Sequence, residues 1–433
     1  MARDTPAWIR SAALYQVYLR NFTREGTFSA AVPRLKAIRE LGFDLVCLTP
    51  IHPVGMANRK GEWGSPYAIA DHRAVDPGLG RIEDLRRFLA EAHGLGLKVL
   101  MDVVFNHSAC DSVLLGTHSE WYLHDAKGRP TRKVADWSDV YDFDFAHREL
   151  REYLLETLAF WAETGFDGFR YDVASLVPLD FWIEARSRLN AERPLLWLAE
   201  SVETGFVKYL RGAGWNAASD PELHEAFDLT YDYDGFGYLK AYFSGSIGLD
   251  AYLRHLLVQE TLYPSHAVKA RFLENHDQPR AASVLRGSDR LMNWTVFSQL
   301  LPGLIFVYMG QEYAMTGRPD LFAKDPVPWD QGSDEFLAFF RRLLPICRRV
   351  KSDHDAFELV ELSAGVLALR WRHPSQNRRC TAIVNLEDRF GECTLPFPLK
   401  GRDLLGETDS PSIGVKNGAK MTIPKRPLIV QET

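Results

Sequence analysis

The sequence predicts an α/β fold, a (β/α)8 TIM barrel with a small lobe inserted after strand 3 and a C-terminal β-sandwich domain. Three observations predict it. Short apolar runs alternate with helical segments over most of the chain, a polar and aromatic stretch follows the third run, and the helical period gives way to alternating runs near residue 357. The chain has 433 residues, more than a single core usually supports, so at least two domains are expected.

Eight short apolar runs have the length and composition of buried parallel strands. In chain order they cover residues 14–18, 45–48, 99–104, 168–171, 196–199, 227–230, 271–273 and 304–308. Between them, helical spacing of apolar residues is clearest in two segments that end near Gly94 and Gly165. Eight strands alternating with helices over about 340 residues are typical of a (β/α)8 barrel with insertions.

Two breaks in this pattern set the predicted domain limits. Residues 108–146 are rich in Asp, Trp and Tyr and are predicted to form the inserted lobe. Residues 351–433 contain alternating runs separated by Gly, Asp and Pro and are predicted to form the β-sandwich domain. Residues 1–107 and 147–350 then form the barrel.

The composition excludes several classes of partner. The chain has 51 Lys and Arg against 57 Asp and Glu and no long run of one sign, so no nucleic acid is expected. The most apolar stretch, 300–309, is too short to span a membrane. The five cysteines are scattered and form no C-x-x-C pair, so neither a disulfide framework nor a zinc site is indicated. The N-terminus lacks the apolar segment of a signal peptide, so a cytoplasmic location is expected, with a trimmed secretory leader as the alternative.

Polar residues gather at the ends of four predicted strands, where a barrel of this kind carries its catalytic groups. They are Asp102, Asn106 and His107 after the third strand, Arg170 and Asp172 at the fourth, Glu200 at the fifth, and His276 and Asp277 after the seventh. Arg170 and Asp172 point to one side of their strand, because side chains alternate along it.

Each of these groups also has a structural interpretation. Asp102 is suited to tie off a strand, and Arg170 with Asp172 to form a buried ion pair. Glu200 has no cation beside it in the sequence, and a lone buried carboxylate is costly, which favours a function. Several carboxylates at one barrel mouth, without thiols or a phosphate loop, favour chemistry at an acetal carbon, where one carboxylate attacks and another transfers a proton. The sequence therefore indicates a glycosidase.

The four segments resemble the four short signature regions of the α-amylase family of glycoside hydrolases. The resemblance extends to Leu14-Tyr-Gln-Val-Tyr, Gly64-Ser-Pro-Tyr-Ala-Ile-Ala-Asp-His and Gly310-Gln-Glu, and it spans nearly the whole barrel. It implies the same three-part fold. It also implies a retaining hydrolase that cleaves α-glucosidic bonds of malto-oligosaccharides or α-glucans through a covalent glycosyl-aspartate intermediate.

The resemblance assigns the reaction to three carboxylates. Asp172 would be the nucleophile, Glu200 the general acid/base, and Asp277 the group that grips the sugar hydroxyls beside the cleaved bond. Arg170 is expected to keep Asp172 ionised, because a neighbouring guanidinium favours a charged carboxylate. The pKa of Glu200 is expected to be higher than that of Asp172, since Glu200 must carry a proton to the leaving oxygen.

The resemblance also implies a substrate-binding set and a candidate metal ligand. The binding set is Tyr67 as a stacking platform, His107 and His276 as hydrogen-bond donors, Arg170, and Asp102 beneath the site. No cofactor is expected for the chemistry. The Asn that matches Asn106 ligates a structural Ca²⁺ in many relatives, so calcium at this residue stays open.

Alternatives remain at the level of the reaction. A transglycosylase or glucoside isomerase of the same family would pass the sugar to another sugar instead of to water. A non-catalytic binding subunit is disfavoured, because all three carboxylates are present. Val173 and further apolar residues follow Asp172 where many starch-cleaving relatives have Lys-His. A preference for short oligosaccharides over starch is therefore expected.

Overall fold

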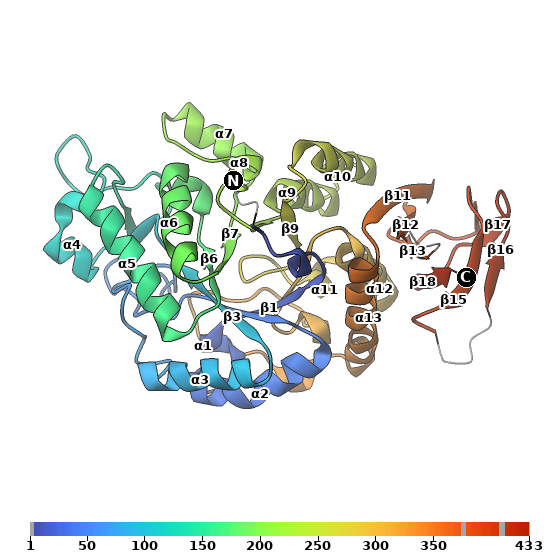
Figure 1. Ribbon diagram of the computed structural model, residues 1–433, viewed down its shortest axis with the longest axis horizontal. Coiled ribbons are helices and arrows are strands. Elements are labelled where there is room, and N and C mark those ends of the chain that lie inside the picture. Colours follow the sequence, from blue (N-terminus) through green and yellow to red (C-terminus); the bar gives the residue numbers. More distant parts are fainter. Residues whose placement is uncertain (1–3, 374–377, 407–411, 433) are drawn as a thin grey trace.

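The computed structural model describes residues 4–373, 378–406 and 412–432. A closed barrel of parallel strands in the order β1-β10-β9-β8-β7-β6-β3-β2 lies at its centre and confirms the predicted barrel (Figure 1). The strands are β1 (Ala13–Val17), β2 (Leu45–Leu48), β3 (Lys98–Val103), β6 (Gly168–Tyr171), β7 (Leu196–Ala199), β8 (Leu229–Tyr231), β9 (Val268–Arg271) and β10 (Leu304–Tyr308). Nearly all their residues are buried, because side chains inside the barrel and helices outside it cover both faces.

Two barrel strands lie elsewhere than predicted. The sixth is Leu229–Tyr231 instead of 227–230, and the seventh is Val268–Arg271 instead of 271–273. Pairing with β8 and β10 fixes the seventh strand. The apolar pattern misplaced it because Lys269 and Arg271 are charged although they are buried.

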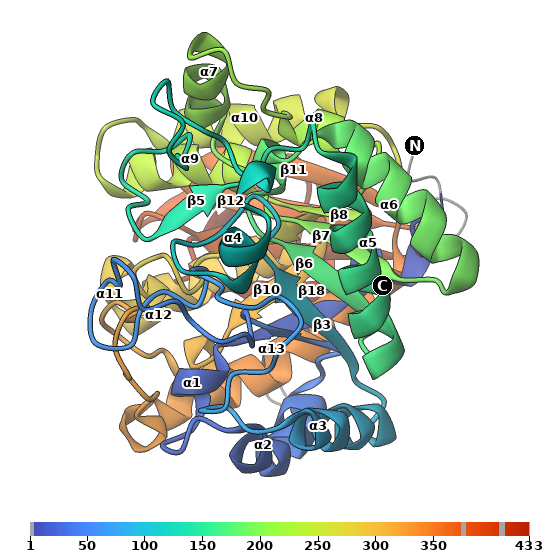
Figure 2. The ribbon, with the colours of Figure 1, turned by 90° about the vertical axis from the view of Figure 1, so that its left-hand side faces the viewer.

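Helices surround the barrel (Figures 1 and 2). The longer ones are α2 (Phe28–Leu41), α3 (Ile82–Gly94), α5 (Arg148–Thr164), α6 (Leu179–Glu192), α7 (Thr204–Gly212), α9 (Tyr233–Phe243), α10 (Leu249–Leu262), α12 (Ser288–Leu300) and α13 (Asp334–Asp353). Short helices are α1 (Leu19–Phe22), α4 (Val113–Thr117), α8 (Asp220–Leu223) and α11 (Ala281–Val284), with 3-10 turns η1 (Ala7–Ser11), η2 (Ser119–Trp121), η3 (Ala174–Leu176), η4 (Gln311–Tyr313) and η5 (Trp329–Gln331). The helix predicted to end near Gly165 ends at Thr164, and Gly165 has the positive φ of 126° that favours glycine after a helix.

The connection after β3 forms the small lobe. Strands β4 (His107–Ala109) and β5 (Val140–Asp142) pair antiparallel, with His107 opposite Asp142. Helix α4 and turn η2 lie between these two strands in the chain. The pairing of β4 with β5 brings the far end of the lobe back to the residues that directly follow β3.

The C-terminal part is antiparallel, as predicted. One sheet has the order β11-β12-β13-β18-β15-β16, and β14 and β17 form a second, two-stranded sheet. The strands are β11 (Ala356–Ser363), β12 (Val366–Arg372), β13 (Arg379–Asn385), β14 (Glu392–Thr394), β15 (Leu399–Asp403), β16 (Ile413–Val415), β17 (Lys420–Thr422) and β18 (Leu428–Glu432). The two sheets share an apolar core that includes Val366, Ile383 and Cys393. Helix α13 continues to Asp353, beyond the predicted limit of the barrel at residue 350.

Two further properties concern the described residues as a whole. Within them no helix is long and apolar enough to cross a membrane. All five cysteines, Cys47, Cys110, Cys347, Cys380 and Cys393, are free thiols.

Candidate active site

One guanidinium at the end of β6 is shared by three carboxylates. Nη1 of Arg170 donates to both carboxylate oxygens of Asp102, at 2.7 and 2.8 Å, and to Oδ1 of Asp172 at 2.9 Å. Nη2 forms an ion pair with Oε1 of Glu200 at 2.8 Å, but its N–H bonds do not point at this oxygen as a hydrogen bond requires. The barrel register sets this arrangement, because Asp102 and Arg170 are direct partners on adjacent strands. The ends of β3, β6 and β7 thus meet at one cation.

Glu200 is also held by the turn that follows Asp172. Its Oε2 accepts the backbone N–H of Val173 at 2.8 Å, and its carbonyl oxygen accepts that of Ala174 at 2.9 Å. Val173 has a φ of 35° and a ψ of 46°. β-Branched residues rarely adopt this left-handed conformation, and such strain is concentrated at functional sites. Asp172 and Glu200 are therefore linked both through Arg170 and through this turn.

Burial and crowding of negative charge raise the pKa values of Asp102 and Asp172. Desolvation, followed by the charge of Glu200, raises the pKa of Asp172 well above its usual range. The pKa of Asp102 rises to about 7, mainly through burial. This differs from the expectation that Arg170 keeps Asp172 ionised, because one guanidinium cannot neutralise three buried carboxylates. Burial thus favours the protonated forms of Asp102 and Asp172 more than the single guanidinium can offset.

Burial decreases from the floor of the site to its mouth. The side chains of Asp102 and Arg170 are completely buried, and those of Asp172 and Glu200 just reach the surface. The side chain of Asp277 is 38% exposed. The three carboxylates predicted to act on the substrate are thus the accessible ones, while Asp102 lies beneath them.

Tyr67 connects this floor to the loop after β9. Its hydroxyl lies 2.9 Å from Oδ2 of Asp102 and 2.6 Å from Nε2 of His276, and the Tyr67 and His276 rings are stacked with centroids 5.4 Å apart. Nδ1 of His276 lies 3.2 Å from Oε1 of Gln16, and Nε2 lies 3.1 Å from Oδ2 of Asp277. Both nitrogens of His276 therefore have protein partners, and a hydrogen bond to a sugar would replace one of them. Burial lowers the pKa of His276 to about 3, so the ring is neutral.

His107 lies where the lobe leaves the barrel. The amide of Asn106 donates from Nδ2 to Nδ1 of His107 at 3.0 Å, which places the ring proton on Nε2. Trp137 packs against the ring, with centroids 5.6 Å apart. Burial lowers the pKa of His107 to about 4, so the ring is neutral, and its remaining N–H is hydrogen-bonded to the backbone of Tyr67, which a sugar hydroxyl would have to replace.

The residues around Asn106 do not fit a bound calcium ion. Oδ1 of Asn106 accepts a hydrogen bond from Nζ of Lys133 at 2.7 Å, so an ammonium occupies the side of the amide that would ligate a metal. In the described parts of the chain, no group of three or more His, Cys, Asp or Glu side chains is placed to hold a metal ion. The oxygen of Asn106 that a Ca²⁺ would need thus already accepts a hydrogen bond from a side-chain cation.

Two site residues were missed by the sequence reasoning, namely Gln16 and Lys133. Gln16 is a polar residue within the apolar strand β1, and this interruption was the signal that could have identified it. Lys133 had no comparable signal. It lies in the lobe, far from Asn106 in the chain, and only the folded lobe brings the two together.

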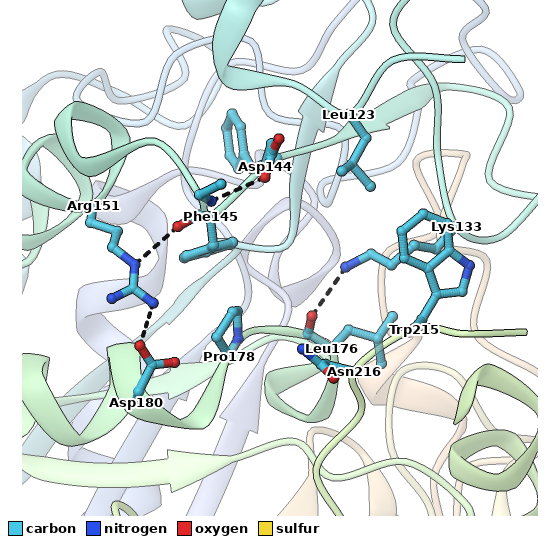
Figure 3. A pocket seen from close by; sticks show the side chains of 12 residues that line it. Leu123, Lys133, Asp144, Phe145, Arg151, Leu176, Pro178, Asp180, Trp215 and Asn216 are labelled. Carbon is cyan, nitrogen blue, oxygen red and sulfur yellow. Dashed lines mark hydrogen bonds and ion pairs between the residues drawn. The ribbon is translucent and has the colours of Figure 1, made fainter. Parts of the chain in front are cut away.

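A cavity of about 340 Å³ lies between the lobe and the start of α6. Figure 3 shows Lys133 and Leu176 at one side of it, with Trp215 and Asn216 beside them and Arg151 paired to Asp180 opposite. The cavity therefore adjoins the turn η3 that follows Asp172, without containing the carboxylates themselves.

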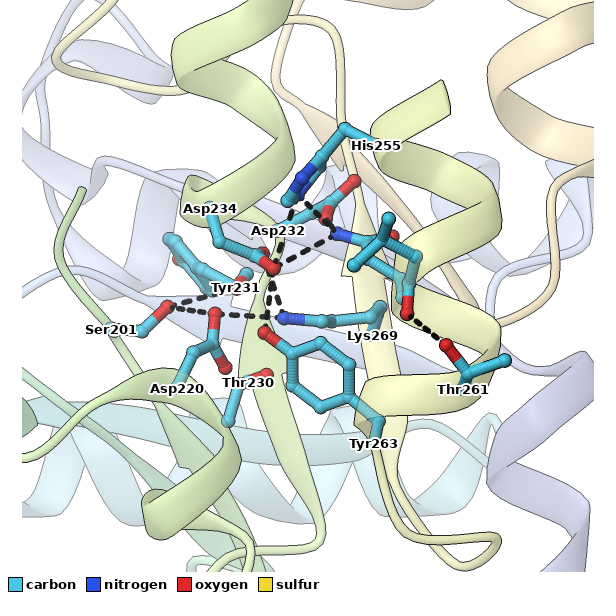
Figure 4. Close-up of polar contacts among 12 residues, drawn as sticks. Ser201, Asp220, Thr230, Tyr231, Asp232, Asp234, His255, Thr261, Tyr263 and Lys269 are labelled. Atoms are coloured by element: carbon cyan, nitrogen blue, oxygen red, sulfur yellow. Dashed lines mark hydrogen bonds and ion pairs between the residues drawn. The ribbon is translucent and has the colours of Figure 1, made fainter. Parts of the chain in front are cut away.

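A second charged network begins at Ser201, the residue after Glu200 in the chain (Figure 4). Ser201 donates from Oγ to Oδ2 of Asp220 at 2.9 Å, and Nζ of Lys269 lies 2.7 Å from the same oxygen and 2.8 Å from Oδ1 of Asp234. Burial raises the pKa of Asp220 to about 7. The residue after Glu200 is thus anchored to a buried lysine of β9.

Known proteins resemble this chain over most of its length. The profile of the alpha amylase catalytic domain matches residues 16–358. The crystal structure of an alpha-amylase from Lactobacillus plantarum is 37% identical and superposes with a TM-score of 0.92, covering 99% of this chain and 100% of that one. The noncanonic maltogenic alpha-amylase AmyB from Thermotoga neapolitana is 34% identical with a TM-score of 0.87, covering 98% and 99%.

Curated relatives are more distant and longer. Alpha-amylase MalA from Haloarcula japonica is 29% identical over 93% of this chain, and Neopullulanase 2 from Thermoactinomyces vulgaris is 24% identical over 80%. The chain spans 59% of the length of the former and 64% of the latter.

Proposed function

The chain belongs to the α-amylase family of glycoside hydrolases, and from this we propose that it is a retaining hydrolase that cleaves α-glucosidic bonds of malto-oligosaccharides or α-glucans. The observation that carries the proposal is the sharing of Arg170 by Asp102, Asp172 and Glu200 at the carboxyl ends of the barrel strands. Several relatives are named for activity on α-glucans, which supports the substrate class.

In the proposed first step, an oxygen of the Asp172 carboxylate attacks the anomeric carbon. The bond from that carbon to the glycosidic oxygen breaks, and Glu200 gives its proton to this oxygen. The products of the step are a glycosyl ester on Asp172 and a shortened sugar with a free hydroxyl. In the second step Glu200 takes a proton from water, the water oxygen attacks the same carbon, and Asp172 is released as a carboxylate.

The surrounding groups support these two steps. The N–H of Val173 holds one oxygen of Glu200 and Nη2 of Arg170 lies beside the other, so the carboxyl group is fixed close to Asp172. Asp277, at the more exposed edge, is proposed to hold the sugar hydroxyls, with the Nε2 proton of His107 and the ring of Tyr67 on other sides. We propose that the chemistry needs no cofactor, since carboxylates supply both the nucleophile and the proton.

The test follows the anomeric proton of the product by NMR during hydrolysis of maltotriose. The α anomer is expected first, because two displacements at one carbon restore its configuration. Initial appearance of the β anomer would contradict the assignment of Asp172. Products longer than the substrate, formed before glucose and maltose accumulate, would favour the transglycosylase alternative. A parallel panel of isomaltose, sucrose, trehalose and soluble starch tests the linkage.

A further inference from the structure

We propose that the ammonium of Lys133 is a built-in cation that ties the lobe to the barrel in place of a bound Ca²⁺ and positions the groups beside Asp172 and His107. This role of Lys133 does not depend on which sugar is the substrate. It does rest on the proposed function where activity is the readout.

Three oxygens from three separate segments surround Nζ of Lys133. Oδ1 of Asn106 lies at 2.7 Å, the carbonyl oxygen of Leu176 at 3.0 Å, and Oδ2 of Asp142 at 3.7 Å. They come from the end of β3, from the turn η3 after β6, and from β5 of the lobe. The Lys133 side chain is only 7% exposed. An ammonium has three donors and no acceptor, so a cage that presents only oxygens matches it.

The charges in this cage balance with one monovalent cation. Asp142 is the one carboxylate in contact with Nζ, and it is completely buried. Its Oδ2 also accepts the backbone N–H of Lys133 at 3.0 Å, which fixes the segment that carries the lysine. Ca²⁺ usually takes six to eight oxygen ligands, often with several carboxylates. A divalent ion here would have fewer protein ligands and an excess of positive charge.

Lys133 also determines which way the Asn106 amide faces. Because Nζ can only donate, the amide oxygen must face the lysine and the amide nitrogen must face away from it. That nitrogen then donates to Nδ1 of His107 at 3.0 Å and to Oδ1 of Asp142 at 3.3 Å. The proton of His107 is thereby kept on Nε2.

The contact with Leu176 reaches the other side of the site. Leu176 closes η3, whose backbone N–H at Ala174 binds the carbonyl oxygen of Glu200. Val173, which binds the Glu200 carboxylate, directly precedes this turn. Figure 3 shows the lysine reaching the Leu176 carbonyl across the edge of the cavity. Lys133 is therefore a positioning residue for two strand ends.

The experiment compares the melting temperature of wild type, Lys133→Met and Lys133→Ala, each after chelation and with about 10 mM CaCl2. Wild type should not change under either condition. Lys133→Met should lose about 5 °C or more, because Asp142 is left buried without a cation. Lys133→Ala should show a similar loss, and Ca²⁺ should restore little of it, because one carboxylate and two neutral oxygens suit a monovalent cation better than a divalent one.

Lys60→Met is the matched control. Lys60 also serves the lobe and contacts one carboxylate and one carbonyl, Asp139 at 2.9 Å and Asp136 at 3.1 Å. The Lys60 side chain is 32% exposed, and these two contacts lie in the lobe, away from the ends of the barrel strands. It should show a smaller loss and no response to Ca²⁺. Positioning is tested by kcat of Lys133→Met on maltotriose below its melting temperature, where a fall of about tenfold is expected.

Several results would overturn the proposal. Loss of wild-type stability on chelation, restored by Ca²⁺, would show that the protein binds a real metal ion. A Lys133→Met protein with wild-type melting temperature would show that the cage does not depend on the ammonium. A Lys133→Ala protein whose melting temperature Ca²⁺ restores to the wild-type value would show that the cage suits a divalent metal ion. If no Lys133 variant folds, the melting temperature of the wild type after chelation and after Ca²⁺ addition decides whether the protein binds a metal ion. None of these melting measurements requires a substrate, so a wrong substrate assignment would be recognised separately.

Discussion

Arg170 illustrates how one residue sets the chemistry of the site. It contacts Asp102, Asp172 and Glu200 together, so removing any of these carboxylates changes the charge that the other two experience. The resemblance identified these residues from their places at strand ends. It did not reveal that the guanidinium is shared, because sharing depends on strand register and side-chain direction.

Replacing either reacting carboxylate should nearly abolish turnover. Asp172→Asn removes the nucleophile and Glu200→Gln removes the proton donor, so each should lower kcat/KM at least a hundredfold, which corresponds to about 2.7 kcal/mol. Steady-state kinetics on maltotriose checks this. Glu184→Gln on the outer helix α6 is the control and should leave kcat/KM close to wild type. If either site variant keeps more than about a tenth of wild-type kcat/KM, the role assigned to that residue is wrong.

The pH dependence tests the raised pKa of Asp172. The negative charge of Asp102 contributes to that increase, so Asp102→Asn should lower the pKa of Asp172. A nucleophile must be deprotonated, and a lower pKa keeps it so at lower pH. The acid limb of the kcat/KM profile should therefore move to lower pH in the variant, whatever its maximal rate. A shift to higher pH would show that loss of the Asp102 contact to Arg170 outweighs loss of its charge.

At the scale of elements, β9 shows where sequence reasoning failed and why. The other barrel strands are mostly apolar runs that the sequence pattern reveals, but Val268–Arg271 carries two buried charged side chains. Carboxylates from α8, from α9 and from the residue between β8 and α9 compensate them. Asp220 pairs with Lys269 (Figure 4), and Asp232 pairs with Arg271. These partners lie dozens of residues away, so no local pattern predicts that the charges are satisfied.

This network predicts a large loss of stability when its lysine is removed. Lys269→Met leaves Asp220 and Asp234 buried without their common cation, so the free energy of unfolding should fall by about 3–5 kcal/mol. Urea denaturation followed by tryptophan fluorescence measures it. Lys98→Met on β3 is the matched control, because Lys98 pairs with Asp167 at the surface with its side chain 49% exposed. It should cost at most about 1 kcal/mol. Equal losses in both variants would mean that burial of the network has little energetic weight.

At the scale of the whole molecule, the barrel and the antiparallel C-terminal part were predictable because their periodicities differ. Period-two alternation indicated the sheets, and buried runs at regular intervals indicated the barrel. The limits were less accurate, since α13 continues to Asp353 although its last three residues carry no apolar side chain that would indicate a helix. The lobe was recognised only as an insertion. Its role in holding Asn106 through Lys133 depends on contacts between segments that are distant in the chain.

The segment between the nucleophile and α6, which includes η3, affects the size of substrate that the site can bind. The residues after the nucleophile, Val173 to Pro178, are mostly apolar. Ser175 is the polar side chain among them that sugars beyond the cleaved bond could contact. In the structure Ser175 is itself buried, and its neighbours Ala174 and Leu176 are buried as well. This segment packs inward, where it contributes to the fold and to the cavities beside it. Added sugar units should therefore gain little binding energy from it.

Short oligosaccharides should consequently be preferred to intact starch. Because contacts that strengthen in the transition state raise kcat/KM, a chain that gains no such contacts should not be cleaved faster as it lengthens. We expect kcat/KM to change less than about threefold from maltotriose to maltoheptaose, a difference of about 0.65 kcal/mol, and to be lower for starch. Chromatography of timed digests measures this. A steady rise of kcat/KM with chain length, together with internal cleavage of starch from the earliest times, would show that loops from other strand ends supply the contacts that η3 does not.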